Sequence, residues 1–474
     1  MLDWSTDSQN VCPYIPNHYD KRLGVTMPEQ ILGASGGPTQ QRAIRLARSP
    51  TTPLPIIRYG FYAFIFTIPI ETLDIGIERG LFSLSHIIGY LFLGTALLQP
   101  EVSFKKLPRP FWYFVAYVSV FICLAVLQKP EYTSLWVARL TTHFQMLVLF
   151  WIAFNLFQDQ RLVKGAFLTL GISCVLLSII QISGGVANSA AQGRVTALSQ
   201  DANTLGSVLS LGLLALLGLT YGRNSGDGRI GLLAWLCFGS LAAGIVLTGS
   251  RGALLSLIAG IMGLMARRGR STLRIKIGFI ALFAIACLVW ASYENDTVRV
   301  RWERALNKGN LAGREKVLPE AWSMFTEKPL LGWGPVSHYV ELGRRFERQS
   351  VDTHNLYLWV LTETGLLGGV PFFVGLWLCW RAAWRARHGA EGSLPIVLLA
   401  CAFMVNMSVT WHNRKLFWLV LAYAVASEQS LWRQWPSTTT SSRQRFPATQ
   451  AEGFAYSNGK MCTVDNFAPD REAS

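Results

Sequence analysis

Charged residues are scarce in this sequence. Asp, Glu, Lys and Arg make up 15% of its 474 residues, whereas 51% are hydrophobic. A typical soluble domain is roughly a quarter charged. The apolar residues come in blocks of about twenty, which is the length that crosses a bilayer as a helix. The composition therefore excludes a soluble protein and predicts an all-α membrane protein.

The patterns of metal, disulfide and nucleotide sites are also missing. Six of the eight cysteines lie in apolar blocks and two near the ends, and no CxxC pair occurs. There is no HExxH, P-loop, GxGxxG or DxD motif. Neither a disulfide framework nor a zinc site is indicated. We expect no metal and no cofactor, which argues against a transferase that uses a metal-bound nucleotide sugar.

Twelve membrane spans are predicted, so the fold expected is a polytopic bundle of about twelve helices. A polar tail at 1–55 has no apolar core of a signal peptide, the membrane domain covers 56–432, and a polar tail follows at 433–474. We expect both tails to be disordered. The predicted spans are 56–76, 80–98, 110–127, 135–157, 162–182, 202–221, 230–248, 252–266, 273–291, 356–380, 393–410 and 416–432.

Lys and Arg alternate between the two sides of this arrangement. With the N-terminus inside, the inner connections carry clusters such as Arg267, Arg268 and Arg270, while the short outer ones carry few. Because cytoplasmic loops collect Lys and Arg, both termini are predicted to be cytoplasmic. The net charge of +15 is then explained by topology and contact with anionic membrane lipids, and not by nucleic-acid binding.

One outer loop is much longer than the others. Residues 292–353 are polar, and their ten Lys and Arg nearly balance nine Asp and Glu. A loop of this length is usually functional. Apolar residues recur at helical spacing within 314–327, which predicts a short amphipathic helix. That helix is expected to lie on the membrane or the bundle, or to pack within the loop. Its apolar positions are Val317, Leu318, Ala321, Trp322 and Phe325.

Two arginines lie in outer connections, although Lys and Arg otherwise collect on the inner side. Arg194 lies in GRVTALSQDAN before the sixth span, and Arg251 lies in LTGSRGALL between the seventh and eighth. An arginine so close to the bilayer needs an anionic partner. A diphosphate suits it, because the guanidinium fork matches phosphate oxygens. Lipid headgroups or a structural carboxylate are the alternative partners.

His354 and Asn355 mark the junction of the long loop with the tenth span. A histidine can accept a proton near neutral pH, although a histidine at a span boundary is more often a packed or interfacial residue. Glu363 follows inside the span, where a carboxylate is costly. It is expected to pair with an arginine such as Arg139, as a supporting or purely structural pair.

The order of these motifs resembles the O-antigen ligase/polymerase superfamily of bacterial inner-membrane proteins, which includes Wzy-type polysaccharide polymerases. The resemblance covers roughly 190–430. It rests on Gly193-Arg194, Asp201-Ala202-Asn203, Thr248 to Gly252, Gly313-Arg314, Trp322, Pro329, Gly332, Gly334, His354-Asn355, Glu363, Gly365 and Gly368. Where the superfamily has a DPN-like triplet, Ala202 stands in place of proline.

The resemblance implies a GT-C-like fold and metal-independent, inverting glycosyl transfer at the periplasmic face. The donor would be a glycan on undecaprenyl diphosphate. Arg194 and Arg251 match arginines that hold the diphosphate, and His354 matches an essential histidine that would be the catalytic base. Arg314 would add a third positive charge or only cap the loop helix. Asn355 and Glu363 would support the site.

The acceptor stays open. It is another lipid-linked glycan in a polymerase and lipid A–core in an O-antigen ligase. The stretch NMSVTWHNRKLFWLVLA resembles exopolysaccharide polymerases and favours the former slightly. Other polysaccharide-export or chain-length proteins would then be partners. The alternative class is a transporter or flippase for lipid-linked glycans, although the arginines gather at one face and not at the midplane, where transporters bind.

Overall fold

The computed structural model describes 52–71, 83–128, 132–184, 189–190, 194–221, 228–264, 313–387, 389, 392–434 and isolated positions between 286 and 307. The chain divides into two units, Met1–Thr52 and Pro53–Ser474, and everything below concerns the second. Most of the predicted ninth span at 273–291, most of 292–312, and all but the inner ends of both tails lie outside the described residues.

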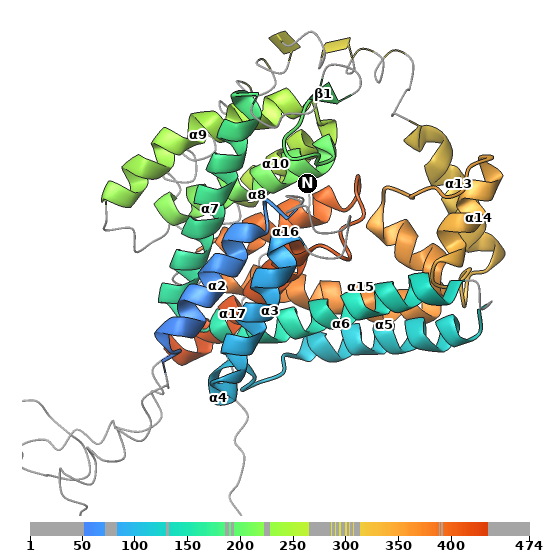
Figure 1. The fold of residues 1–474 in the computed structure, drawn as a ribbon, viewed down its shortest axis with the longest axis horizontal. Helices are drawn as coiled ribbons and strands as arrows, with labels where there is room; N and C mark the ends of the chain where they lie inside the picture. Colours follow the sequence, from blue (N-terminus) through green and yellow to red (C-terminus); the bar gives the residue numbers. More distant parts are fainter. Residues whose placement is uncertain are drawn as a thin grey trace, which may run out of the picture. The chain divides into compact units, whose positions relative to one another are not determined.

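Fourteen α-helices and one short β-ribbon make up the described part of the chain (Figure 1). The helices are α2 (Pro55–Thr67), α3 (Leu84–Leu97), α4 (Pro100–Ser103), α5 (Arg109–Val126), α6 (Thr133–Leu156), α7 (Gln160–Ile182), α8 (Ala202–Tyr221), α9 (Gly228–Thr248), α10 (Arg251–Leu264), α13 (Arg314–Glu327), α14 (Ser337–Arg345), α15 (Leu356–Ala386), α16 (Leu394–Val405) and α17 (Lys415–Gln434). The ribbon pairs β1 (Ser189–Ala190) with β2 (Arg194–Val195).

The all-helical prediction is confirmed, and each predicted span except 273–291 overlaps a helix, although α2 covers only the first part of the predicted span 56–76. Within the described residues, five helices are long and apolar enough to cross a membrane, namely α5, α6, α7, α8 and α15. Four shorter helical stretches are also apolar, at Leu84–Leu97, Cys237–Thr248, Arg251–Gly263 and Leu394–Val405. The chain is thus a multi-pass membrane protein by its helix composition. The number of twelve crossings stays a prediction.

Short polar side chains define where three of the long helices begin. The Asp159 carboxylate accepts the amide of Arg161 at the start of α7. Asp201 accepts two amides of the first turn of α8, and Asn355 accepts two of the first turn of α15. These caps satisfy backbone donors that a helix leaves unpaired at its N-terminus. Two of them, Asp201 and Asn355, belong to motifs that the sequence singles out.

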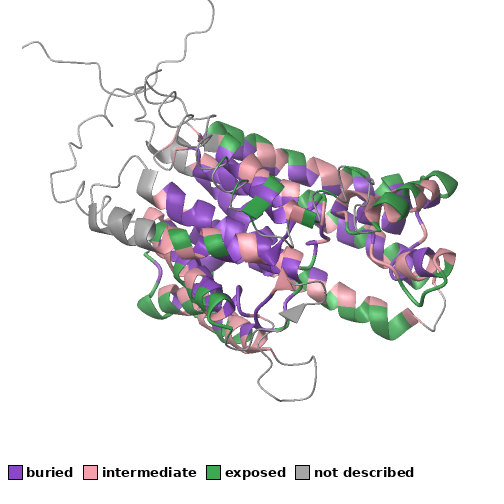
Figure 2. Cartoon of the chain, turned by 90° about the horizontal axis from the view of Figure 1, so that it is seen from above, coloured by how far each residue is buried: buried purple, intermediate pink, exposed green. Residues whose placement is uncertain are grey.

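Helices α8 and α17 form the interior of the bundle. α8 packs against α7, α9, α10 and α16, and α17 packs against α6, α15 and α16. Every residue from Leu416 to Ala426 is buried. Buried residues run along the inner faces of the helices, and exposed residues cover the outer faces (Figure 2). Many of the exposed residues are large and apolar, including Leu98, Trp112 and Trp377, which suits a surface in contact with lipid.

The long loop carries two helices where one was predicted. α13 occupies the predicted residues 314–327, so that prediction is confirmed. Its buried positions are Ala321 and Met324, whereas Trp322 is 53% exposed. The predicted apolar face is therefore rotated, because α13 packs on α15 and forms a small core with Leu342 of the unpredicted α14.

A kink in α15 receives the loop. Gly365 interrupts the helix at φ 59°, ψ −158°, and the amides of Trp333 and Gly334 donate to the carbonyls of Thr362 and Glu363 at 2.8 and 2.9 Å. A Cβ on Gly332 would lie 2.7 Å from the Gly365 amide, and both glycines have positive φ. The LGWG and ETGLLGG motifs thus form one junction that only glycine permits.

Candidate functional site

Arg194 joins two motifs that are far apart in the sequence. From strand β2, its Nε donates to the Thr248 carbonyl at 2.8 Å and its Nη2 to Asn203 Oδ1 at 3.0 Å. The hydroxyl of Ser250 donates to the same amide oxygen at 3.0 Å. The GR, DAN and TGSRG segments therefore meet at Asn203, the second residue of α8.

Arg251 is the first residue of α10 and is half-buried. It directly follows Ser250, which places it beside the Arg194–Asn203 pair. Gly249 before it has φ 57°, and a Cβ on Gly252 after it would overlap the Ser408 hydroxyl. The glycines of TGSRG thus let the start of α10 approach the connector between α16 and α17.

Arg314 reaches the same connector from the long loop. It begins α13, and its Nη2 donates to the Ser408 carbonyl at 2.7 Å. Since Ser408 also packs against Gly252, the residue after Arg251, the starts of α10 and α13 meet at Ser408. Arg314 stands in the first turn of α13, where the helix dipole disfavours a cation. Its hydrogen bond to Ser408 is made to the bundle and not to its own helix, and its role stays a prediction.

His354 is held in a conformation that few residues adopt. Its φ is 49°, in the left-handed region, and its amide donates to Asp352 Oδ1 at 2.6 Å. The Thr410 hydroxyl donates to the same oxygen at 2.8 Å. The side chain of His354 is exposed. A non-glycine residue kept at positive φ by its surroundings is typical of functional sites.

The residues 406–410, between α16 and α17, connect these segments. The carbonyl of Asn406 accepts the Leu356 amide at 2.9 Å, and that of Met407 accepts Asn355 Nδ2 at 3.5 Å. Ser408 binds Arg314 and packs on Gly252, and Thr410 binds Asp352. Sequence reasoning gave this connector no role in the site. A run of Asn, Ser and Thr between two apolar helices was the signal that marks it.

The expected ion pair between Glu363 and Arg139 is present. Arg139 Nη1 of α6 lies 3.6 Å from Glu363 Oε1 of α15, and the hydroxyl of Tyr117 of α5 donates to Oε2 at 2.9 Å. The guanidinium of Arg139 also stacks on Tyr339 and Trp359, at 4.5 and 4.9 Å from the ring centroids. The pair ties three helices and α14 together beneath the loop.

Buried histidines also surround Trp359. His338 lies 4.3 Å from this indole and His412 5.2 Å, measured between ring centroids. Burial, followed by the charge of Arg139, lowers the pKa of His338 well below its usual range. His338 is therefore neutral, and its 3.8 Å approach to Glu363 is packing and not an ion pair. Within the described residues, no group of three His, Cys, Asp or Glu side chains is placed to hold a metal.

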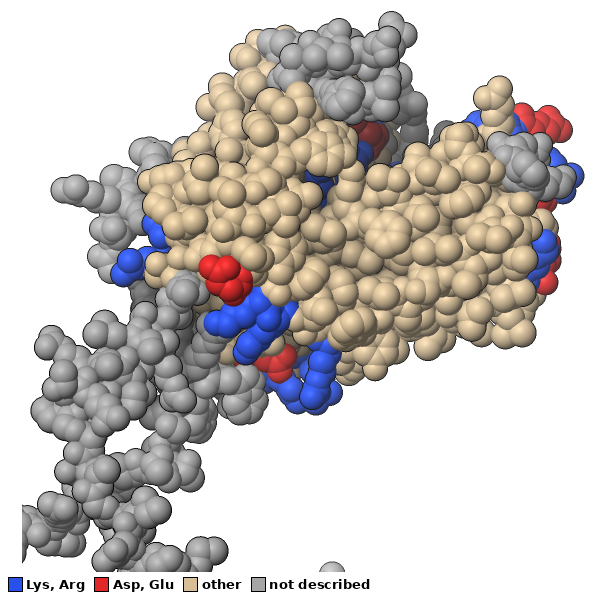
Figure 3. Space-filling view, turned by 60° about the horizontal axis from the view of Figure 1, so that its bottom comes forward, with Lys and Arg blue, Asp and Glu red and all other residues tan. Residues whose placement is uncertain are grey.

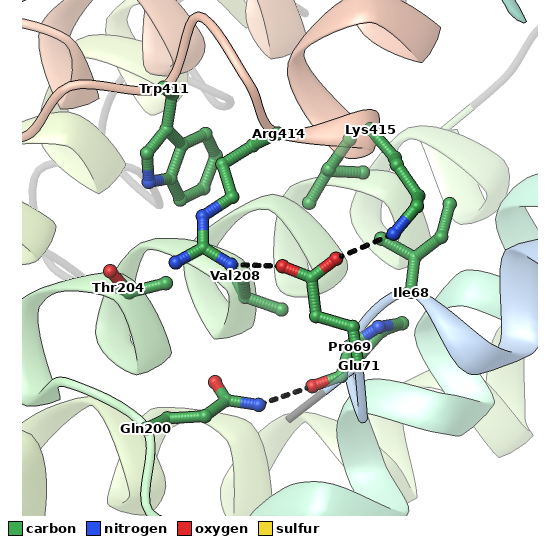
Figure 4. A pocket seen from close by; sticks show the side chains of 10 residues that line it. Ile68, Pro69, Glu71, Gln200, Thr204, Val208, Trp411, Arg414 and Lys415 are labelled. Atoms are coloured by element: carbon green, nitrogen blue, oxygen red, sulfur yellow. Dashed lines mark hydrogen bonds and ion pairs between the residues drawn. The ribbon is translucent and has the colours of Figure 1, made fainter. Parts of the chain in front are cut away.

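A second charged cluster involves residues that follow the connector in the chain (Figure 4). Arg414 and Lys415 both pair with Glu71, which follows α2. They line a small cavity of about 20 Å³ with Gln200 and Thr204, and Gln200 donates to the Pro69 carbonyl at 2.6 Å. Thr204 follows Asn203, the partner of Arg194. None of the three charged residues of this cluster was among the predicted site residues.

The structure thus brings the predicted site residues to one end of the bundle. Arg194 binds Asn203, which also binds Ser250, the residue before Arg251. Arg314 binds Ser408, which packs on Gly252, the residue after Arg251. His354 approaches the connector through its neighbours, Asp352 and Asn355. Glu363 stands apart from the connector, within the bundle, where it supports the loop.

The fold and this cluster together define a multi-pass α-helical membrane protein with a polar, arginine-rich centre at one end. Residues 232–373 match the family Wzy_C, O-antigen ligase, which confirms the resemblance inferred from the motifs. Residues 232–373 therefore form a domain of the O-antigen ligase type. The match includes Arg251, Arg314 and His354 and ends before the connector, while Arg194 precedes it. No curated protein matches the chain.

Proposed function

We propose that this protein transfers a glycan from undecaprenyl diphosphate to an acceptor sugar hydroxyl, at the periplasmic face of a bacterial inner membrane. The observation that carries the proposal is that the segments bearing Arg194, Arg251 and Arg314 meet one another and the connector 406–410. The segment of His354, whose side chain is exposed, is bonded to the same connector through Asp352 and Asn355. Three arginines and a histidine on segments that meet in this way suit a substrate that has a diphosphate at the bond to be broken.

The arginines would assist the departure of the lipid carrier. When the bond between the anomeric carbon and the diphosphate oxygen breaks, its electron pair leaves with undecaprenyl diphosphate. Fixed positive groups stabilise this developing charge most effectively where water is scarce. Such a site needs no metal. Arg194 is already oriented by Asn203 and Thr248, so little reorganisation is required when the substrate binds.

His354 would be the general base. The acceptor hydroxyl attacks the anomeric carbon on the side opposite the diphosphate, and its proton passes to the imidazole. Attack from that side inverts the anomeric centre. The exposed ring of His354 is accessible to an acceptor, and the bonds of Asp352 fix the backbone that carries it.

We further propose that the acceptor is a second lipid-linked glycan, so that the enzyme is a polymerase. The support is the stretch from Asn406 to Ala422, which resembles exopolysaccharide polymerases and supplies the connector of the site. A ligase acting on lipid A–core is the alternative. In a deletion strain, single repeat units on the lipid carrier indicate a lost polymerase, whereas long lipid-linked chains that never reach lipopolysaccharide indicate a lost ligase.

Arg251→Lys tests the diphosphate site in the same strain. Lysine keeps the charge but cannot make the paired hydrogen bonds of a guanidinium. A charged hydrogen bond contributes about 1.5–3 kcal/mol, so polymer synthesis should fall roughly ten- to a hundredfold. Arg161→Lys, at an exposed position at the start of α7, is the matched control and should be fully active. Equal activity of the two variants at equal expression would argue against the arginine fork.

A further inference from the structure

A second cationic site lies at the opposite end of the bundle. α15 runs from the His354 junction to Ala386, and Arg381 lies near its far end. An α-helix rises 1.5 Å per residue, so Arg381 lies roughly 35 Å from the start of α15, measured along the helix. A site at this end is therefore on the other membrane face from the proposed catalytic centre.

The pocket at this end has charged and apolar walls. It has a volume of about 570 Å³, within the range of roughly 300–1,000 Å³ that is typical of ligand sites. Its lining residues are Lys106, Arg109, Arg381, Arg385, Glu428, Gln429, Pro110, Leu378, Ala382 and Val425. Figure 3 shows Lys and Arg side chains gathered on the forward face of the molecule, with carboxylates among them.

The cations exceed the carboxylates that accompany them. Arg385 is paired with Glu428 at 2.9 Å. The other three cations, Lys106, Arg109 and Arg381, form no ion pair with any residue that the structure describes. The pocket therefore keeps about three uncompensated positive charges next to an apolar wall.

The position of these cations is fixed by the fold. The backbone of Lys106 is held on both sides by the amide of Asn155, whose Oδ1 accepts its N–H at 3.0 Å and whose Nδ2 donates to its carbonyl at 2.9 Å. Arg109 begins α5, which has no acidic residue in its first turn and no side-chain cap. The dipole of α5 disfavours a cation there, so the local positive potential is raised further.

We propose that this pocket binds the phosphodiester headgroup of an anionic phospholipid. The cations contact the phosphate, and the acyl chains leave towards the bilayer along Leu378, which is half-buried. Basic pockets between spans on the cytoplasmic side are suited to such headgroups. Free phosphate carries the same kind of charge, but it has no apolar part that would contact the apolar wall of the pocket. This inference does not rest on the proposed glycosyl transfer.

The test compares two triple variants of the full-length protein. Lys106→Gln/Arg109→Gln/Arg381→Gln removes the pocket cations. Lys105→Gln/Arg161→Gln/Lys164→Gln removes three exposed cations from the same end that do not line the pocket. Binding of cardiolipin, phosphatidylglycerol, phosphatidylcholine and inorganic phosphate is measured by native mass spectrometry of protein in detergent. Since all substituted residues are exposed, both variants should keep the wild-type melting temperature.

The pocket variant should bind cardiolipin and phosphatidylglycerol roughly a hundredfold more weakly, given about tenfold or less for each basic residue. The control variant should bind within a few-fold of wild type, and phosphatidylcholine should not respond to either change. Equal weakening in both variants would overturn the proposal, because general surface charge would explain it. Pocket-dependent binding of inorganic phosphate without a matching loss of cardiolipin would overturn it in favour of a free anion.

Discussion

Glu363 is a carboxylate within a span, and the side chains around it explain how it is tolerated. It is completely buried, paired with Arg139 and bonded to Tyr117. Removing one partner of a buried ion pair leaves the other uncompensated, which typically costs about 3–5 kcal/mol. Since Arg139 is 24% exposed, the lower end of this range applies.

Glu363→Gln should therefore lower the stability of the purified protein by about 3 kcal/mol. Glutamine keeps the size of the side chain and can still accept the Tyr117 hydroxyl, so the loss reports the charge. Thermal unfolding in detergent measures it, with Glu101→Gln at an exposed position of α4 as the control. If the two variants unfolded at the same temperature, the pair would contribute nothing to holding the loop.

For single residues, the sequence predicted which charged side chains pair better than it predicted which polar side chains connect the segments of the site. The pairing of Glu363 with Arg139 was expected, because a carboxylate within a span requires a cation. Asn203 was noted only as part of a triplet, although its side-chain oxygen joins Arg194 to Ser250. The two hydrogen bonds to Asn203 join segments that are far apart in the sequence. They depend on how the helices pack, which the sequence does not specify. The same holds for Glu71, whose partners lie more than three hundred residues away.

Among the elements, the junction of the long loop with α15 is the most demanding. Gly365 has φ 59°, and a Cβ there would meet the Leu330 carbonyl and lie 2.7 Å from the Gly332 amide. Both the backbone conformation and the close approach exclude any other residue. The bonds from Trp333 and Gly334 to α15 depend on this geometry.

Gly365→Ala should accordingly detach the loop from α15 and abolish glycan transfer. The strain and overlap together cost about 2–4 kcal/mol. Limited proteolysis within 328–350 should become faster, and polymer should disappear. Gly94→Ala in α3, where a Cβ meets nothing within 4 Å, should leave both unchanged. A Gly365→Ala protein with a protected loop would contradict this account of the junction.

The spacing of apolar residues predicted where the helices lie better than it predicted which side of each helix is buried. α13 occupies the predicted residues, yet its buried side is set by α14 and α15 and not by its own most apolar residues. α14 was not predicted because SHYVELGRR has only Val340 and Leu342 as aliphatic residues, and its buried residues are His338, Leu342 and Gly343. The connector 406–410 was read as the end of one span. Its role depends on three distant segments that contact it.

For the whole molecule, the topology is the main prediction. The His354 end should face the periplasm and the Lys106 end the cytoplasm. A membrane-impermeant maleimide should label Ser350→Cys in intact cells, and Lys105→Cys only after permeabilisation, in a background without native cysteines. Both positions are exposed. The reverse pattern would place the arginine centre on the cytoplasmic side and refute a periplasmic transfer.

The central claim is that the residues gathered around 406–410 carry out glycosyl transfer with His354 as the base. The most direct test is the release of undecaprenyl diphosphate from a lipid-linked glycan by purified protein in a bilayer, for wild type and His354→Asn. Asparagine tolerates the left-handed backbone at this position but cannot accept the proton. The account predicts that His354→Asn binds the donor normally and releases the carrier at least a hundredfold more slowly. Release at the wild-type rate would contradict it.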